Sequence, residues 1–439
     1  MKITIIGGGL AGCEAAWQLA SAGLEVDIYE MKTQKRTPAQ TLSTMAELVC
    51  SNSLRSDRLT NAVGLLKAEM RKLDSLVMRA ADATAVPAGG ALAVDREGFS
   101  AYIDQIIKDH PLIHVHEEEI TQIPQEGTVI IATGPLTSDA LSDEISKLDG
   151  LSTLHFYDAA APIVTSESLD MSKVFRMSRY ERGDDYLNCP MDRDEYFAFV
   201  HALQTAETVA VHGFEEKSVF EGCMPIESMA KRGDMSIAFG PLKPVGLKDP
   251  RTNKEPFAVV QLRCDNYAGS LYNLVGFQTR LTFPEQRRVF GMIPGLENAE
   301  FARLGVMHRN TFISSPEFLD DTFRVINNER LYFAGQITGV EGYVESAASG
   351  LLVGITLAHR SKGLDVPHFS GKTAIGAMGR YVSTPNRRFQ PMNCAFGLID
   401  QLDVIPGEKR IRNKQLRYEK ISERALAEVD AVISQMEQK

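Results

Sequence analysis

The beginning of the chain alternates between short apolar runs and glycine-rich or polar positions. Ile3–Ile6 is an apolar run that leads directly into glycines, and Val26–Tyr29 is a second strand-like run that ends at Glu30. Between them, apolar residues recur at helical spacing as far as Leu19, and Gly23 follows the last of them. This order predicts a strand, a turn, a helix and a second strand, the opening unit of a dinucleotide-binding fold.

The glycines have the G-x-G-x-x-G spacing of a pyrophosphate-binding loop. In such a loop the first glycine permits a tight turn, the second lets the backbone approach the pyrophosphate, and the third lets the helix pack on the strand. The helix N-terminus favours the negative charge, and an acid about 20 residues downstream can bind the ribose hydroxyls. The candidate cofactor-binding residues are therefore Gly7, Gly8, Gly9, Leu10, Ala11, Gly12 and Glu30. A glycine-rich turn without a ligand is the alternative.

Two later apolar segments resemble further nucleotide-contacting parts of two-dinucleotide-binding flavoproteins. Thr128–Gly134 reads TVIIATG, a buried strand that ends in a turn of small residues. Leu331–Gly354 reads as an apolar strand, a turn at Gly335 followed by Gln336, and then a helix of small residues. These segments favour FAD over NAD and add Gly335 and Gln336 to the candidate cofactor-binding residues. Each segment alone could also be a plain βα unit.

Because the FAD segments lie near both ends of the chain, the middle is expected to be an insertion. We predict an α/β, Rossmann-like two-dinucleotide-binding flavoprotein fold. Its FAD-binding domain is discontinuous (residues 1–150 and 328–439), and an inserted α/β domain spans residues 151–327. In the middle, two strand-like runs and one helical run are Phe257–Cys264, Leu271–Phe277 and Glu195–Gln204.

Two further helices follow from the spacing of apolar residues. One is predicted from about Ala62 through Val77, and the tail Gly407–Gln438 is predicted to form a single long helix that is basic at its start. This basic start is a candidate RNA contact, as are Arg387-Arg388 and the basic cluster between Lys243 and Lys254. A solvated helix face is the alternative for the tail.

The composition is that of an ordinary globular protein. Its 439 residues suffice for two or three domains, and 44% of them are apolar and 24% charged. No run approaches the ~20 apolar residues that span a bilayer, and no secretory signal precedes the first strand, so we expect a cytoplasmic protein without a membrane partner. The net charge of −10 argues against a general nucleic-acid binder, so any RNA should contact local basic patches.

The six cysteines are widely spaced, and no pair has C-x-x-C spacing. We therefore expect reduced thiols and no metal site. Cys50 stands beside Ser51, Asn52 and Ser53, whose polar groups could lower the pKa of its thiol. Cys223 lies between a glycine and a proline turn, which predicts an exposed loop. Either could be a nucleophile or a structural thiol, whereas Cys13, inside the first helix, is expected to serve packing.

Several longer strings are far more specific than the glycine loop. They include AELVCSNSLRS, VPAGGALAVDRE, FEGCMPIE, GFQTRLTFPEQ and GVMHRNTFI. In these strings the sequence resembles the TrmFO (Gid) family, the methylenetetrahydrofolate- and FAD-dependent tRNA (uracil-5-)-methyltransferases, from Met1 to about Arg417. The resemblance implies that NADPH or NADH reduces FAD and that 5,10-methylenetetrahydrofolate donates a methylene carbon. It also implies that FAD carries this carbon to C5 of a uridine in the T-arm of tRNA and supplies the reducing electrons.

The resemblance also implies roles for individual residues. Uracil C5 becomes nucleophilic after a thiolate adds to C6, and a second group must then remove the C5 proton. By motif, Cys223 falls at the family's nucleophile position and Cys50 at the position of the second thiol, the proposed general base; which thiol performs which step stays open. His308 falls in a segment that resembles the family's folate site, where its ring could stack on the pterin. A surface or core histidine is the alternative.

Three other functions compete with this hypothesis. The same chemistry could act on a ribosomal RNA uridine. The related glucose-inhibited-division A family, which modifies wobble uridines, shares the AGQITGVEGY-like segment but not the full set of cysteine motifs. An RNA-binding flavoprotein in which FAD only holds the fold would need neither Cys50 nor Cys223.

Overall fold

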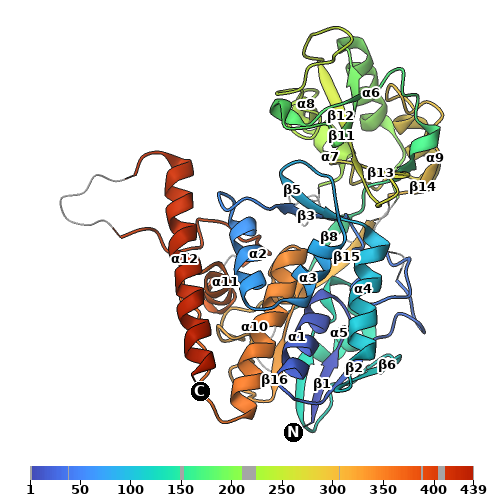
Figure 1. Ribbon diagram of the computed structural model, residues 1–439. Helices are drawn as coiled ribbons and strands as arrows, with labels where there is room; N and C mark the ends of the chain where they lie inside the picture. The colour runs from blue at the N-terminus through green and yellow to red at the C-terminus, as the bar shows by residue number, and fades with distance from the viewer. Residues whose placement is uncertain are drawn as a thin grey trace.

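The computed structural model describes residues 2–37, 39–148, 153–209, 224–305, 307–386, 389–403 and 411–438 (Figure 1). The α-helices are α1 (Leu10–Ser21), α2 (Ala62–Lys72), α3 (Leu76–Ala83), α4 (Arg96–Asp109), α5 (Asp139–Ile145), α6 (Arg193–Thr205), α7 (Ile226–Lys231), α8 (Ser236–Phe239), α9 (Phe283–Phe290), α10 (Tyr343–Ser361), α11 (Ala374–Ser383) and α12 (Lys414–Glu437). Short 3-10 helices are η1 (Gly134–Leu136), η2 (Ser166–Ser168), η3 (Arg179–Glu181) and η6 (Gln336–Thr338).

The strands form a parallel sheet, an antiparallel sheet and two smaller ladders. They are β1 (Ile3–Ile6), β2 (Val26–Tyr29), β3 (Ser53–Ser56), β4 (Ala85–Val86), β5 (Ala91–Val94), β6 (Ile113–His116), β7 (Thr128–Ile131), β8 (Thr153–Ala159), β9 (Ile163–Thr165), β10 (Phe175–Arg176), β11 (Tyr186–Met191), β12 (Ala258–Cys264), β13 (Leu271–Leu274), β14 (Phe301–Arg303), β15 (Met307–Ile313) and β16 (Leu331–Phe333).

The parallel sheet has the strand order β16-β7-β1-β2-β6. Every residue of β1 and of β7 is buried, as expected for central strands that are covered on both faces. Helices α1 and α10 lie side by side in this part of the molecule (Figure 1). A Cβ atom on Gly350 would lie 2.1 Å from the carbonyl oxygen of Ala11, so glycine at this position permits the close helix contact.

The antiparallel sheet has the order β10-β11-β12-β13-β9-β14 and carries a second hydrophobic core. Its large buried side chains include Tyr196 and Phe199 from α6 and Phe290 from α9. This part stands above the parallel sheet in Figure 1, and the β8–β15 ladder lies between the two. The hydrophobic core around the parallel sheet includes Ile313, Phe318, Leu319, Phe323 and Val325, so the chain returns to this core before residue 327.

Several predicted elements are confirmed, and two are wrong in extent. The first two strands have the predicted bounds, and α1 ends just before Gly23, whose φ is +84°. The helix predicted from Ala62 through Val77 is instead two helices, α2 and α3. Asp74 between them has a φ of +54°, and Ser75 caps α3 by accepting a hydrogen bond from Met78 N.

The tail helix begins later than the sequence predicted. Its N-cap is Asn413, whose side chain accepts a hydrogen bond from Leu416 N at 3.1 Å, so the helix starts at Lys414 rather than at Gly407. Residues 404–410 lie outside the described residues, as does Arg387-Arg388. No described helix combines the length and the apolar character that a membrane crossing requires.

Candidate active site

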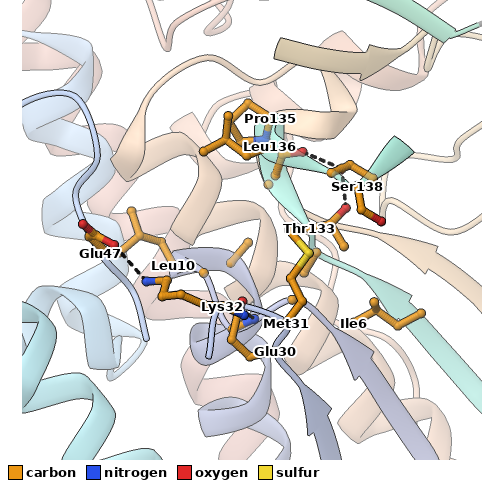
Figure 2. A pocket seen from close by; sticks show the side chains of 18 of the residues that line it. Ile6, Leu10, Glu30, Met31, Lys32, Glu47, Thr133, Pro135, Leu136 and Ser138 are labelled. Atoms are coloured by element: carbon orange, nitrogen blue, oxygen red, sulfur yellow. Dashed lines mark hydrogen bonds and ion pairs between the residues drawn. The ribbon is translucent and has the colours of Figure 1, made fainter. Parts of the chain in front are cut away.

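The carboxyl ends of the parallel strands surround a large pocket, which encloses about 1030 Å³ including space open to solvent (Figure 2). The strand order reverses on either side of β1, and ligands of open α/β sheets bind at such a switch point. Lining residues that follow these strands are Gly7, Gly8, Gly9, Leu10 and Ala11 after β1; Glu30, Met31 and Lys32 after β2; Glu118, Glu119 and Ile120 after β6; Ala132, Thr133 and Gly134 after β7; and Gly335 and Gln336 after β16.

The three glycines of the loop have different surroundings. Gly7 has a φ of +106°, and a Cβ atom there would lie 2.6 Å from the carbonyl oxygen of Ala132. A Cβ atom on Gly12, which does not line the pocket, would lie 1.9 Å from the carbonyl oxygen of Gly7. In contrast, a Cβ atom on Gly9 would meet nothing within 4 Å. Gly7 and Gly12 therefore permit close packing, whereas Gly9 faces open space that a ligand could fill.

Glu30 closes the second strand at the edge of this pocket. Its carboxylate accepts hydrogen bonds from Gly8 N at 2.7 Å and from Lys32 N at 2.9 Å. The structure thus holds an acidic side chain directly beside the glycine loop, where the sequence predicted it.

A buried ion pair that sequence analysis missed lies on one side of the pocket. Lys32 Nζ is 3.0 Å from Glu47 Oε2, and both side chains are buried (Figure 2). Burial alone would raise the pKa of Glu47, but hydrogen bonds from Thr41 and Lys32 lower the pKa overall. The available signal was a lysine two positions after the acid that closes the second strand.

The third predicted nucleotide segment completes the wall of the same pocket. Gly335 has a φ of +85°, its N–H donates to Ser349 Oγ at 2.7 Å, and a Cβ atom there would lie 3.1 Å from the Cβ atom of Ala11. Gln336 donates to Glu341 Oε2 at 2.7 Å. Segments about three hundred residues apart in the chain therefore meet at one pocket.

The segment that carries Cys50 reaches the edge of the pocket. Cys50 is half-buried, and its N–H donates to Tyr343 Oη at 2.7 Å; Ser51 N donates to the same oxygen at 3.2 Å. Tyr343 and Val49 both line the pocket. Burial raises the pKa of Tyr343, so its phenol is neutral at neutral pH. Sequence analysis did not identify Tyr343, although it lies in the third nucleotide segment.

Three arginines from separate elements bind the backbone and side chains of residues 48–52. Arg96 of α4 donates to Leu48 O, and its other nitrogens pair with both carboxylate oxygens of Asp265 at 2.9 and 3.1 Å. Arg263 of β12 donates to Asn52 Oδ1 at 3.0 Å and to Ser51 Oγ at 2.6 Å. Arg303 of β14 donates to Ala39 O at 2.8 Å and to Val49 O at 2.9 Å. None of these arginines was found from the sequence.

The side chains of two predicted site residues, Cys223 and His308, lie outside the part of the chain that the structure describes. Cys223 lies outside the described residues, so its distance from Cys50 is not defined. The segment that follows it is firmly held, because Ile226 N donates to Gln278 O at 2.8 Å. The backbone of His308 pairs with that of Asp158 in the β8–β15 ladder, but its side chain is outside the described part.

The remaining predictions concern Cys13, disulfides and metal ions. Cys13 is buried and its thiol donates to Gly8 O at 3.3 Å, which confirms a packing role. Burial raises the pKa of this thiol. Of the five cysteines within the described ranges, none forms a disulfide. Those ranges also contain no cluster of three or more His, Cys, Asp or Glu side chains that could hold a metal ion.

The chain matches known proteins over nearly its whole length. The family model "Glucose inhibited division protein A" matches residues 2–365. The methylenetetrahydrofolate–tRNA-(uracil-5-)-methyltransferase TrmFO of Lactobacillus johnsonii is 58% identical over 432 residues, which cover 98% of each chain. The protein of the same name from Listeria monocytogenes is 57% identical over 437 residues, which cover 99% of each chain.

A solved structure supports the fold. GidA of Aquifex aeolicus superposes with a TM-score of 0.71 at 16% identity, covering 98% of this chain and 73% of that one. This likeness confirms the predicted Rossmann-like α/β fold. With full-length relatives at 57 to 58% identity, the chain belongs to the glucose inhibited division protein A family and, within it, to the TrmFO group.

Proposed function

We propose that this protein methylates C5 of the T-loop uridine in the T-arm of tRNA. The carbon comes from 5,10-methylenetetrahydrofolate, FAD is the bound cofactor, and NADPH or NADH is the electron source. The observation that carries this proposal is the 2.7 Å hydrogen bond from Cys50 N to Tyr343 Oη, because Tyr343 also lines the dinucleotide pocket. A thiol segment and a dinucleotide site are thereby joined, as this chemistry needs.

The residues around the pocket fit FAD. Open space at Gly9, the N-terminus of α1 directly after it and the carboxylate of Glu30 beside the loop are what a pyrophosphate and a ribose require. Gly335 and Gln336 also line this pocket. When bound, FAD would carry the one-carbon unit and supply the electrons that reduce it to a methyl group.

The chain's own contribution is covalent activation of uracil. We assign Cys223 as the nucleophile: its thiolate adds to C6, and the electron pair of the C5–C6 double bond makes C5 nucleophilic. After C5 has gained the carbon, Cys50 accepts the C5 proton, the C6–S bond breaks, and the double bond re-forms. We assign His308 to the folate, where its ring would stack on the pterin.

The first test is methyl transfer to unmodified tRNA. Purified protein would be incubated with NADPH and with methylenetetrahydrofolate labelled in its methylene carbon. We expect label in 5-methyluridine of the T loop. Label that enters ribosomal RNA instead would move the substrate to an rRNA uridine, and no incorporation from protein that holds FAD would refute the proposal.

Cysteine variants test the assignment of the thiols. Cys223→Ala and Cys50→Ala should each lower methyl transfer at least about a thousandfold while bound FAD is retained, because the glycine loop and Glu30 are left unchanged in both variants. Cys264→Ala is the matched control, since this half-buried thiol donates only to Asn266 O, at 3.0 Å. Loss of flavin in Cys223→Ala would show that this residue is structural.

The compartment follows from the reaction. Folate, reduced nicotinamide and unmodified tRNA meet in the cytoplasm, and we therefore place the protein there. Separation of cell extracts into membrane and cytoplasmic fractions would check this assignment.

A further inference from the structure

In the described part of the chain, the arginines that bind residues 48–52 carry more positive charge than neighbouring carboxylates neutralise. Arg263 is only 7% exposed and binds neutral groups: the side chains of Asn52, Ser51 and, at 3.5 Å, Asn273. Arg303 binds two backbone carbonyls. Within the described part of the chain, neither guanidinium forms an ion pair with a carboxylate. Arg96, by contrast, is neutralised by Asp265.

Such an arrangement is unfavourable unless a negative charge is close by. A buried cation is normally paired, because burial removes its hydration. Burial lowers the pKa of both Arg263 and Arg303, which reflects this cost. Tyr186 and Asp265 oppose the shift at Arg263, Tyr343 and Glu47 oppose it at Arg303, and Cys50 adds a smaller effect in the same direction on each. These two guanidiniums bind Val49, Ser51 and Asn52, the residues on either side of Cys50, whose thiol can itself become an anion.

The other charged groups near Cys50 are already paired or neutral. Both carboxylate oxygens of Asp265 bind Arg96. Glu47 is paired with Lys32. Tyr343 is neutral because burial raises its pKa. Among the described residues, the unbalanced charge near Cys50 is thus positive and comes from Arg263 of β12 and Arg303 of β14.

We propose that Arg263 and Arg303 are positioning residues that hold residues 48–52 in place and keep the Cys50 side chain as a thiolate at neutral pH. The use of this thiolate as the base for the C5 proton rests on the proposed function, but its existence does not. A resting thiolate accepts the C5 proton without first losing its own, and the resulting thiol returns that proton to solvent before the next cycle.

The test measures the reactivity of Cys50 itself. Protein with bound FAD is treated with iodoacetamide between pH 5 and 9, and alkylation of the Cys50 peptide is followed by mass spectrometry, which separates it from other thiols. Because the thiolate is the reactive species, the rate reports its population. We expect a midpoint below about pH 7, against about 8.5 for an ordinary thiol.

Substitutions then test whether Arg263 and Arg303 lower the midpoint of Cys50 alkylation. In Arg263→Met and in Arg303→Met the midpoint should rise by about one pH unit, which makes alkylation at pH 6.5 about fivefold slower. The pH dependence of methyl transfer should shift in the same direction. Arg263→Lys should restore the midpoint because it keeps the charge, although it cannot reproduce both hydrogen bonds of the guanidinium.

Arg179→Met is the matched control. Arg179 is also an arginine of the inserted domain that binds neutral partners, Gln261 Oε1 at 2.9 Å and Val245 O at 2.8 Å, but it has no contact with residues 48–52. Its substitution should leave the Cys50 midpoint unchanged. Circular dichroism and flavin content verify folding of each variant, and the wild-type midpoint is decisive even if one variant does not fold.

Two results would overturn the inference: a wild-type midpoint at or above about 8.5, or an unchanged midpoint in both methionine variants. The outcome is separable from that of the proposed function. A low midpoint in a protein that methylates no RNA would retain the thiolate and reject the reaction. An ordinary midpoint in an active methyltransferase would reject only the thiolate.

Discussion

Gly9 and Gly12 lie three residues apart, but their missing side chains serve different purposes. At Gly12 a Cβ atom would overlap the carbonyl oxygen of Gly7, so glycine is needed for the fold itself. At Gly9 the space is open, and we infer that the cofactor pyrophosphate uses it. A substitution at Gly12 should therefore lower the free energy of unfolding, whereas a substitution at Gly9 should lower the flavin content.

We predict that Gly9→Leu loses most of its bound FAD without unfolding, because the new side chain occupies the pyrophosphate position. The flavin-to-protein absorbance ratio and the unfolding midpoint of the flavin-free protein are the measurements. Gly397→Leu is the control, since a Cβ atom there also meets nothing within 4 Å and the residue is exposed outside the pocket. Full flavin content in Gly9→Leu would disprove the assignment of the loop.

At the scale of elements, the sequence predicts well what local patterns encode. Glycine spacing and apolar runs identify β1, α1 and β2 with their bounds. The break between α2 and α3 was missed because apolar periodicity continues across it, although Ser75 is a recognisable N-cap signal. The arginines around Cys50 could not be found, because α4, β12 and β14 are far apart in the chain and only tertiary folding brings them together.

Helix α11 depends on a buried carboxyl group from α2. Glu69 accepts hydrogen bonds from Ala374 N at 2.7 Å and Ile375 N at 2.9 Å, at the start of α11. Burial raises the pKa of Glu69 to about 8, although these hydrogen bonds oppose the rise. In the unfolded chain the pKa of glutamate is about 4.3. Between these values the folded state holds a proton that the unfolded state has lost.

The contribution of Glu69 to the free energy of unfolding therefore falls as pH rises from about 4.3 to 8, by at most about 1.4 kcal/mol per pH unit. We predict that Glu69→Gln removes this dependence, so its stability relative to wild type improves steadily from pH 5 to pH 8. Urea unfolding at several pH values measures the difference. Parallel curves for the two proteins would contradict the prediction, and Glu423→Gln, an exposed control, should show parallel curves.

At the scale of the whole molecule, side chains from the parts around the two largest hydrophobic cores of the described chain meet at residues 48–52. Arg96 comes from the part built on the parallel sheet, while Asp265, Arg263 and Arg303 come from the inserted part. Their bonds fix the Cys50 segment relative to both cores. The position of the antiparallel sheet is thus linked to that of the Cys50 segment, which the sequence could not show because the contacts join residues far apart in the chain.

Substitution of Asp265 tests how much its ion pair with Arg96 contributes to the stability of the protein. Asp265→Ala leaves Arg96 buried and unpaired, so we expect the free energy of unfolding to fall by about 3–5 kcal/mol. Asp430→Ala removes an exposed ion pair with Lys72 and should cost at most about 1 kcal/mol. Denaturant unfolding followed by circular dichroism compares the two.

The double variant Arg96→Met/Asp265→Leu distinguishes the effect of this ion pair on the free energy of unfolding from its effect on methyl transfer. Apolar side chains of similar volume can replace a buried ion pair at little cost, so the double variant should recover most of the stability lost in Asp265→Ala. It should not recover methyl transfer, because a methionine side chain cannot donate to Leu48 O and the Cys50 segment loses one of its three arginine contacts. Recovery of both stability and activity would mean that the domain contact supports the fold alone.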